Sequence, residues 1–325
     1  MKRREFLAFV SGGFASPWAA RAQQSDRVRR IGYLSPAARF NHLDEAFENA
    51  LQQLGWVKDR DIKIEYRYTD GRQDKVGPVV TEVVGLRLDL FVAWSPPLAL
   101  GIKQAAPQSP VVFLMTTVDP IALGLVSNLA RPGGNVTGIA FASEQIIAKR
   151  LQLLKEVVPS LARVAVLFST ELNRSSETMD ALKAAAKALR VELDEVEVEV
   201  PQSLEAAIRG AKHRGAQAVY VWPNGFSFAF RKEISDVASA HGLPSIHWLR
   251  EAVLAGGLLA YATDLKQQAE RGAAYVDKIL RGTPAGSLPI ELMSKYELVI
   301  NLKTATALGL TIPPTLLARA DEVIE

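Results

Sequence analysis

Two tryptophans stand at the ends of apolar runs, and each is followed at once by a polar turn. Trp94 closes the run LFVAW and precedes Ser95, while Trp222 closes AVYVW and precedes Pro223 and Asn224. An indole ring offers a broad apolar face, and the turns after it offer hydroxyl, amide and backbone hydrogen-bonding groups. We interpret the two strand ends as halves of one site for a small organic molecule. The alternative is that each ring only plugs the core of its own sheet.

Other polar residues follow predicted strands in the same manner. Ser95, Thr117 and Asn224 would supply directional hydrogen bonds to a ligand, and Asp119 or His247 a charged or polar anchor. Two of these have a structural alternative: Asp119 is placed to cap a following helix that starts at Pro120, and His247 to be a hydrogen-bonded core histidine. From the residues alone, the candidate ligand contacts are Ser35, Trp94, Ser95, Thr117, Asp119, Trp222, Asn224 and His247.

Signatures of catalysis are missing from the sequence. It contains no phosphate-binding glycine loop, no G-x-S-x-G turn and no H-E-x-x-H pair, and its four histidines are scattered. There is no cysteine, which excludes thiol nucleophiles, disulfides and a lipid-modified N-terminal cysteine. We therefore expect no enzyme activity, no metal and no organic cofactor.

The excess of positive charge lies in the first 22 residues. There Lys2, Arg3, Arg4 and Arg21 outnumber Glu5, and the other 34 basic residues are balanced by 34 acidic ones, out of 38 and 35 in all. A basic start, an apolar middle and an Ala-Arg-Ala exit are the features of an export signal, and Arg3-Arg4 resembles the twin-arginine type. We expect cleavage near Ala22, an exported periplasmic protein and no nucleic-acid partner.

The remaining chain alternates strand and helix patterns and then repeats that order. The runs RIGYLSP and RVAVLFS begin 133 positions apart, and continuous apolar runs such as 88–93 are typical of parallel strands buried on both faces. The acidic stretch 191–200 reads as a charged edge strand. The sequence predicts an α/β protein with two Rossmann-like, doubly wound lobes. Ligands of such sheets bind beyond the carboxyl ends of the strands, where the two lobes would face each other.

Several longer stretches resemble a known protein family. They are RIGYLSP, ALQQLGWVKDRDIKIEYRYTDG, VDPIALGLVSNLARPGGNVTGIAF, KRLQLLKEVVP and KYELVINLKTATALGLTIPPTLLARADEVIE. Together they resemble the substrate-binding proteins of ABC transporters of the TrpX-like, aromatic-amino-acid type, over residues 27–325. The resemblance implies a type I periplasmic-binding-protein fold with a hinge, and it adds Tyr261, near a returning strand, to the candidate ligand contacts.

The resemblance also implies how the chain divides. Residues 1–22 would be the export signal, 27–139 and about 250–283 the first lobe, and 140–249 and about 284–325 the second. Two departures concern the ligand: members commonly have a small residue in place of Trp94 and an Asp-containing turn in place of that at Asn224. The class of protein carries over to this chain, and the identity of the ligand does not.

These observations predict a function. We expect a monomer that closes on a small organic ligand, aromatic or amino-acid-like, and delivers it to an ABC permease in the inner membrane. A periplasmic sensory receptor of the same fold is an alternative that sequence does not separate from this one. An exported α/β enzyme is a more distant alternative.

Overall fold

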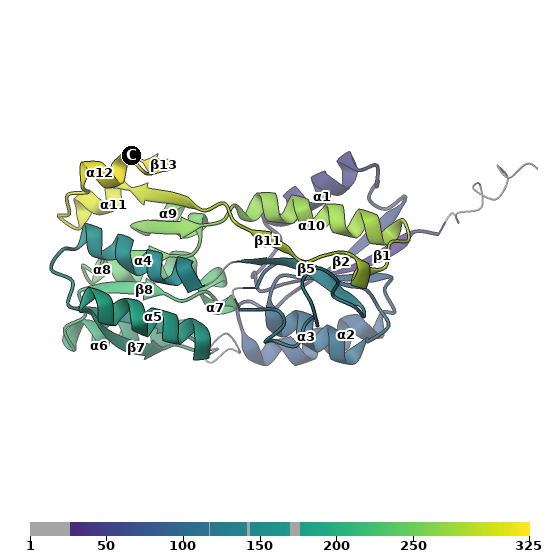
Figure 1. The fold of residues 1–325 in the computed structure, drawn as a ribbon, viewed down its shortest axis with the longest axis horizontal. Coiled ribbons are helices and arrows are strands. Elements are labelled where there is room, and N and C mark those ends of the chain that lie inside the picture. Colours follow the sequence, from purple (N-terminus) through teal and green to yellow (C-terminus); the bar gives the residue numbers. More distant parts are fainter. Residues whose placement is uncertain (1–26, 117, 142–143, 170–175) are drawn as a thin grey trace, which may run out of the picture.

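The protein folds as two lobes that lie side by side (Figure 1). The structure is a computed structural model, and it describes residues 27–116, 118–141, 144–169 and 176–325. The expected export signal at 1–22 and its cleavage site near Ala22 lie outside the described residues. Each lobe is built on one sheet with helices on both faces, so the predicted fold of two α/β lobes is confirmed.

The first lobe contains a six-stranded parallel sheet with the order β11-β5-β4-β3-β1-β2. Its strands are β1 (Arg29–Ser35), β2 (Ile62–Tyr68), β3 (Leu90–Ala93), β4 (Val111–Phe113), β5 (Val136–Phe141) and β11 (Glu291–Met293). Its helices are α1 (His42–Gln53), α2 (Val76–Gly85), α3 (Pro96–Ala105) and α10 (Leu265–Leu280), with 3-10 turns η2 (Gln73–Lys75) and η3 (Ala285–Ser287).

The second lobe contains a seven-stranded sheet with the order β13-β12-β10-β9-β8-β6-β7, in which β10 and β12 pair antiparallel. Its strands are β6 (Arg163–Phe168), β7 (Glu192–Glu197), β8 (Ala218–Val221), β9 (Ser245–His247), β10 (Leu259–Ala262), β12 (Glu297–Asn301) and β13 (Glu322–Ile324). Its helices are α4 (Glu144–Val157), α5 (Ser176–Leu189), α6 (Pro201–His213), α7 (Gly225–Ala229), α8 (Arg231–Ala240), α9 (Arg250–Leu254), α11 (Leu302–Ala307) and α12 (Pro314–Leu317).

Alternation along the strands explains why both faces of each sheet are covered. In β3, Leu90 and Val92 pack with α1 and α10, whereas Phe91 and Ala93 face α2 and α3. Residues of β6 divide in the same way between the face under α4 and α5 and the face under α6 and α8. A strand that buries both faces needs an unbroken apolar run, which is the pattern that the sequence shows. The acidic strand β7 lies at the sheet edge, as predicted.

The chain crosses between the lobes three times, between β5 and α4, between β10 and α10, and between β11 and β12. The later crossings differ from the expected boundaries at about 250 and 284. Strand β10 pairs with β9 in the second lobe, and β11 pairs with β5 in the first. Residues 250–262 thus belong to the second lobe and 285–293 to the first. The reason is that a strand pairs with whichever strand lies beside it in the folded protein. The sequence contains no Pro- or Gly-rich linker at the observed crossings that would have marked them.

None of the helices in the described part of the chain combines the length and the apolar character that spanning a bilayer requires.

The close pairing of β4 with β5 depends on Gly138, which gives a first prediction. Gly138 lies opposite Phe113 with φ of 155°, and a Cβ added there would sit 2.0 Å from the Phe113 carbonyl oxygen. Because a backbone atom cannot yield as a side chain does, Gly138→Ala should lower the free energy of unfolding by at least about 3 kcal/mol.

Urea denaturation followed by circular dichroism measures this loss. Gly77→Ala in α2 is the matched control, because nothing lies within 4 Å of the added Cβ there. It should leave stability unchanged or raise it by up to about 1 kcal/mol. Equal midpoints for the two variants would contradict the close-approach explanation.

Candidate functional site

Trp94 lies in a buried apolar cluster that extends across both lobes. The ring is 1% exposed, and its indole N–H donates to the hydroxyl of Tyr33, which packs edge-on against it. The same cluster includes Phe228 and Trp248 from the second lobe. Burial raises the pKa of Tyr33 well above its usual value, so this hydroxyl stays protonated. Trp94 thus stands at the lobe boundary, and its proposed contact with a ligand stays a prediction.

The turn after Trp222 is held by a network of hydrogen bonds. Asn224 caps the short helix α7: its side-chain oxygen accepts from the Ser227 backbone N–H at 2.7 Å. The Ser227 hydroxyl donates to the Trp222 carbonyl at 2.7 Å and accepts from the Trp248 indole N–H at 2.9 Å. Trp222 itself is 3% exposed and packs against Tyr220 in the second-lobe core. The abrupt turn therefore has a structural cause, and a ligand contact by Trp222 stays a prediction.

Two of the predicted residues meet across the lobe boundary. Ser95 and Asn224 line one small pocket between the lobes, with Pro96, Met115, Thr116, Pro223 and Gly225. Its volume is about 10 Å³, which is room for about one water molecule. The strand ends of the two sheets therefore face each other, with the lobes drawn together at this point.

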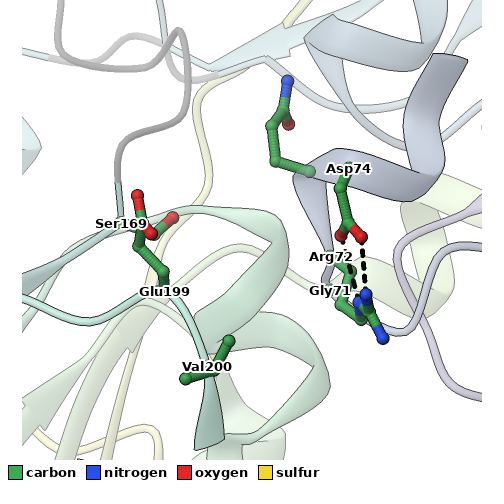
Figure 2. Close-up of a pocket in the computed structure, with 7 residues that line it drawn as sticks. Gly71, Arg72, Asp74, Ser169, Glu199 and Val200 are labelled. Carbon is green, nitrogen blue, oxygen red and sulfur yellow. Dashed lines mark hydrogen bonds and ion pairs between the residues drawn. The ribbon is translucent and has the colours of Figure 1, made fainter. Parts of the chain in front are cut away.

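A larger cavity opens between the lobes beside this pocket. Its volume is about 440 Å³, within the range of small-molecule sites, and its lining comes from both lobes. Figure 2 shows Arg72 and Asp74 joined by an ion pair on one side, with Ser169 and Glu199 on the other. The buried Ser169 hydroxyl has no hydrogen-bond partner among the residues that the structure describes. This cavity can take a polar or charged organic group.

Direct contacts hold the two lobes together. His42 at the start of α1 lies 3.3 Å from the Glu251 carboxylate in α9. Gly71, which follows β2 with φ of 66°, packs so closely on α7 that an added Cβ would lie 2.8 Å from the Gly225 carbonyl oxygen. The two lobes therefore contact each other directly at these points.

His247 is a buried, neutral histidine. It is 1% exposed, and its Nε2 lies 2.9 Å from the Ser245 hydroxyl. Burial lowers its pKa to about 3. The ring can take part in a hydrogen bond near pH 7 but carries no charge, so it does not suit the role of a charged anchor.

The other predicted contacts have varied surroundings. Ser35 is buried, and its hydroxyl accepts from the Ala37 N–H at 3.2 Å. Asp119 is exposed and accepts from the Ile121 N–H at 2.8 Å, but turns follow it in place of the expected helix. Tyr261 is half-buried and stacks on Tyr296. Thr117 lies outside the described residues.

Sequence reasoning did not single out Arg150 and Gln268, which are among the buried polar residues. Arg150 on α4 is 6% exposed, and Gln268 on α10 is fully buried with neither side-chain polar atom hydrogen-bonded to a described residue. Each lies on a helix that begins next to a lobe crossing. No signal in the sequence marks them, because their surroundings come from strands far away in the chain.

Among the residues that the structure describes, no three His, Asp or Glu side chains gather as a metal site would require.

The buried state of His247 predicts a dependence of stability on pH. The ordinary pKa of a histidine is near 6.5, so below that pH His247 is protonated in the unfolded chain. In the folded chain it stays neutral until about pH 3. This contribution to stability is complete above pH 6.5 and is lost as the pH falls. From pH 7 to pH 5 we expect a loss of about 2 kcal/mol in the free energy of unfolding.

Urea denaturation at the two pH values, on wild type and His247→Gln, measures the effect. The stability of His247→Gln should fall much less between pH 7 and pH 5 than that of wild type. His213→Gln, at an exposed position on α6, should lose as much stability as wild type does. A wild-type and a His247→Gln protein with the same pH dependence would refute the assignment.

Comparisons with known proteins agree with this architecture. Residues 37–324 match the family model described as ABC transporter substrate binding protein. The chain is 26% identical over 290 residues to a tyrosine-binding protein of Clostridioides difficile, a match that covers 88% of this chain and 82% of the relative.

Two solved structures show the same fold. One is an ABC domain in complex with L-Trp from Streptococcus pneumonia, with a TM-score of 0.82, 24% identity and coverage of 92% of this chain and 100% of that one. The other is the ligand-free, open structure of a substrate-binding protein from Clostridium difficile, with a TM-score of 0.61, 22% identity and coverage of 91% and 99%. With a family match across nearly the whole described chain, the expected resemblance is confirmed, and this chain belongs to the ABC transporter substrate-binding proteins.

Proposed function

We propose that this protein is the extracytoplasmic binding component of an ABC importer, and that it closes its lobes on an aromatic or amino-acid-like solute. The observation that carries the proposal is the cavity of about 440 Å³ whose walls come from both lobes. A ligand held there contacts both lobes at once, so its binding energy can favour a closed state over an open one.

Similarity to the two solved structures supports a closing motion. The chain matches the L-Trp complex with a TM-score of 0.82 and the ligand-free, open protein with 0.61. In this chain the lobes contact each other directly at Gly71 and His42. Three chain crossings can act together as the hinge.

The chemical class of the ligand is supported from two sides. The related proteins are named for tyrosine binding and for a complex with L-Trp. In this chain Ser95 and Asn224 line the inner pocket, and Trp94 lies at the lobe boundary. The proposal has four further parts. The protein would be a periplasmic monomer, it would deliver its ligand to an inner-membrane permease, and it would not catalyse a reaction.

Ligand-induced thermal stabilisation tests the proposed function. We expect L-tyrosine, L-tryptophan or a related aromatic compound to raise the melting temperature by several degrees, because ligand at 100 times its dissociation constant adds about 2.7 kcal/mol. The bound compound should be recovered unchanged after long incubation. No stabilisation by any aromatic or amino-acid compound, or chemical turnover of a bound one, would contradict the proposal.

Ser95→Ala tests whether the ligand extends from the larger cavity to the inner pocket that Ser95 lines. The Ser95 side chain makes no capping hydrogen bond to α3, so its loss should cost the fold little. One lost hydrogen bond to the ligand should weaken binding about three- to tenfold in isothermal titration calorimetry. Ser287→Ala, at an exposed position of the same lobe, is the control and should bind as wild type does. An unchanged affinity of Ser95→Ala would mean that the ligand does not reach the inner pocket.

A further inference from the structure

Arg150 is a cation that the second lobe encloses almost completely. It projects from α4 and is 6% exposed. A guanidinium keeps its charge at any physiological pH, even though burial lowers the pKa of Arg150 from its usual value. The second lobe thus holds a fixed positive charge away from bulk water.

The described groups around this charge are neutral. The Arg150 Nε donates to the Tyr261 carbonyl at 2.9 Å, and the hydroxyl of Tyr220 lies beside the guanidinium. No carboxylate of the described residues forms an ion pair with it, although partly exposed arginines such as Arg163 and Arg250 have such partners. A buried charge without a counter-ion is unfavourable, and a bound anion would compensate it.

The position of Arg150 points to the same conclusion. Tyr261 is the third of the four residues of β10, directly before the chain crosses to the first lobe. Tyr220 precedes Trp222 by two residues at the end of β8. Long side chains on a helix lean toward its N-terminus, and α4 begins just after another crossing. The guanidinium therefore lies at the cleft end of the second sheet, near the hinge.

Two aromatic residues near this charge form a stacked pair. Tyr261 and Tyr296 stack with ring centroids 5.6 Å apart and an angle of 24° between their planes, and both are half-buried. Tyr296 also contributes to the electrostatic surroundings of Arg150. Flat rings beside a cation match a molecule that carries an aromatic ring and an acid group.

We propose that Arg150 recognises the carboxylate of an aromatic acid, amino acids included, whose ring packs against the Tyr261–Tyr296 pair. The inference rests on the proposed function and deepens it by naming the acid group of the ligand that Arg150 would recognise. A planar guanidinium offers two parallel N–H groups to the two carboxylate oxygens, so removal of either charge should remove most of the recognition. The neutral amide or the decarboxylated amine of the same compound should bind far more weakly.

Matched ligand pairs on matched variants test this role. The probes are L-tyrosine with tyramine and L-tyrosinamide, L-tryptophan with tryptamine, and 4-hydroxyphenylacetate with its amide. Calorimetry would measure their affinities for wild type, Arg150→Gln, Arg150→Lys and the control Arg163→Gln. Arg163 forms an ion pair with Glu192 at the opposite end of the second sheet.

We expect wild type and Arg163→Gln to bind an acid at least tenfold more tightly than its neutral analogue. Arg150→Gln should lose that preference by weakening the acid at least tenfold and the neutral analogue less than twofold. Arg150→Lys should recover part of the preference, because it restores the charge without the paired donors.

Three outcomes would overturn the assignment. Equal weakening of acid and neutral analogue in Arg150→Gln would mean that Arg150 only supports the fold. Equal binding of acid and neutral analogue by wild type would exclude a carboxylate partner even if the variants fail to fold, and it would leave the proposed function intact. A wild-type protein that binds none of the probes would contradict the proposed aromatic ligand, and the assignment with it.

Discussion

Parallel strands bring their carboxyl ends to one edge of a sheet, and in this protein two such edges face each other. This arrangement decides where every turn residue after a strand can lie. Ser95 follows β3 and Asn224 follows β8, and they line one pocket although 128 positions of sequence separate Trp94 from Trp222. The crossings between the lobes connect the two sheets close to these edges. A molecule that fits between the edges can therefore be gripped from both sides.

Residues at these edges serve the fold as well as any ligand. Asn224 caps α7, Ser227 joins the Trp222 carbonyl to the Trp248 indole, and Tyr33 accepts from Trp94. Such bonds fix the positions of the turns, so that the polar groups of the turns that are not used in these bonds keep a fixed orientation toward a ligand. A rigid edge loses less conformational entropy when the ligand binds than a flexible one does, and this smaller loss favours affinity.

Electrostatics distinguishes two buried basic residues. Burial lowers the pKa of His247 to about 3, so its ring is neutral and needs only the hydroxyl of Ser245. Arg150 cannot lose its proton in the same way and lies among tyrosines without a described carboxylate partner. His247 is therefore a neutral, hydrogen-bonded residue of the core, whereas Arg150 is suited to bind an anionic group of a ligand.

The sequence by itself determined the α/β class, the repeated order of strands and helices, the charged edge strand and the family, because these depend on local apolar periodicity and on motifs that are contiguous in the chain. It predicted that Ser95 and Asn224 share a site, since both follow parallel strands. Tertiary structure alone decided where the chain crosses between lobes, that turns and not a helix follow Asp119, and how deeply Trp94 and Trp222 are buried. Only it revealed Arg150, whose neighbours Tyr220 and Tyr261 lie 70 and 111 positions away (220 − 150 and 261 − 150). Burial and charge compensation depend on groups that meet in space, and no pattern of neighbouring residues encodes them.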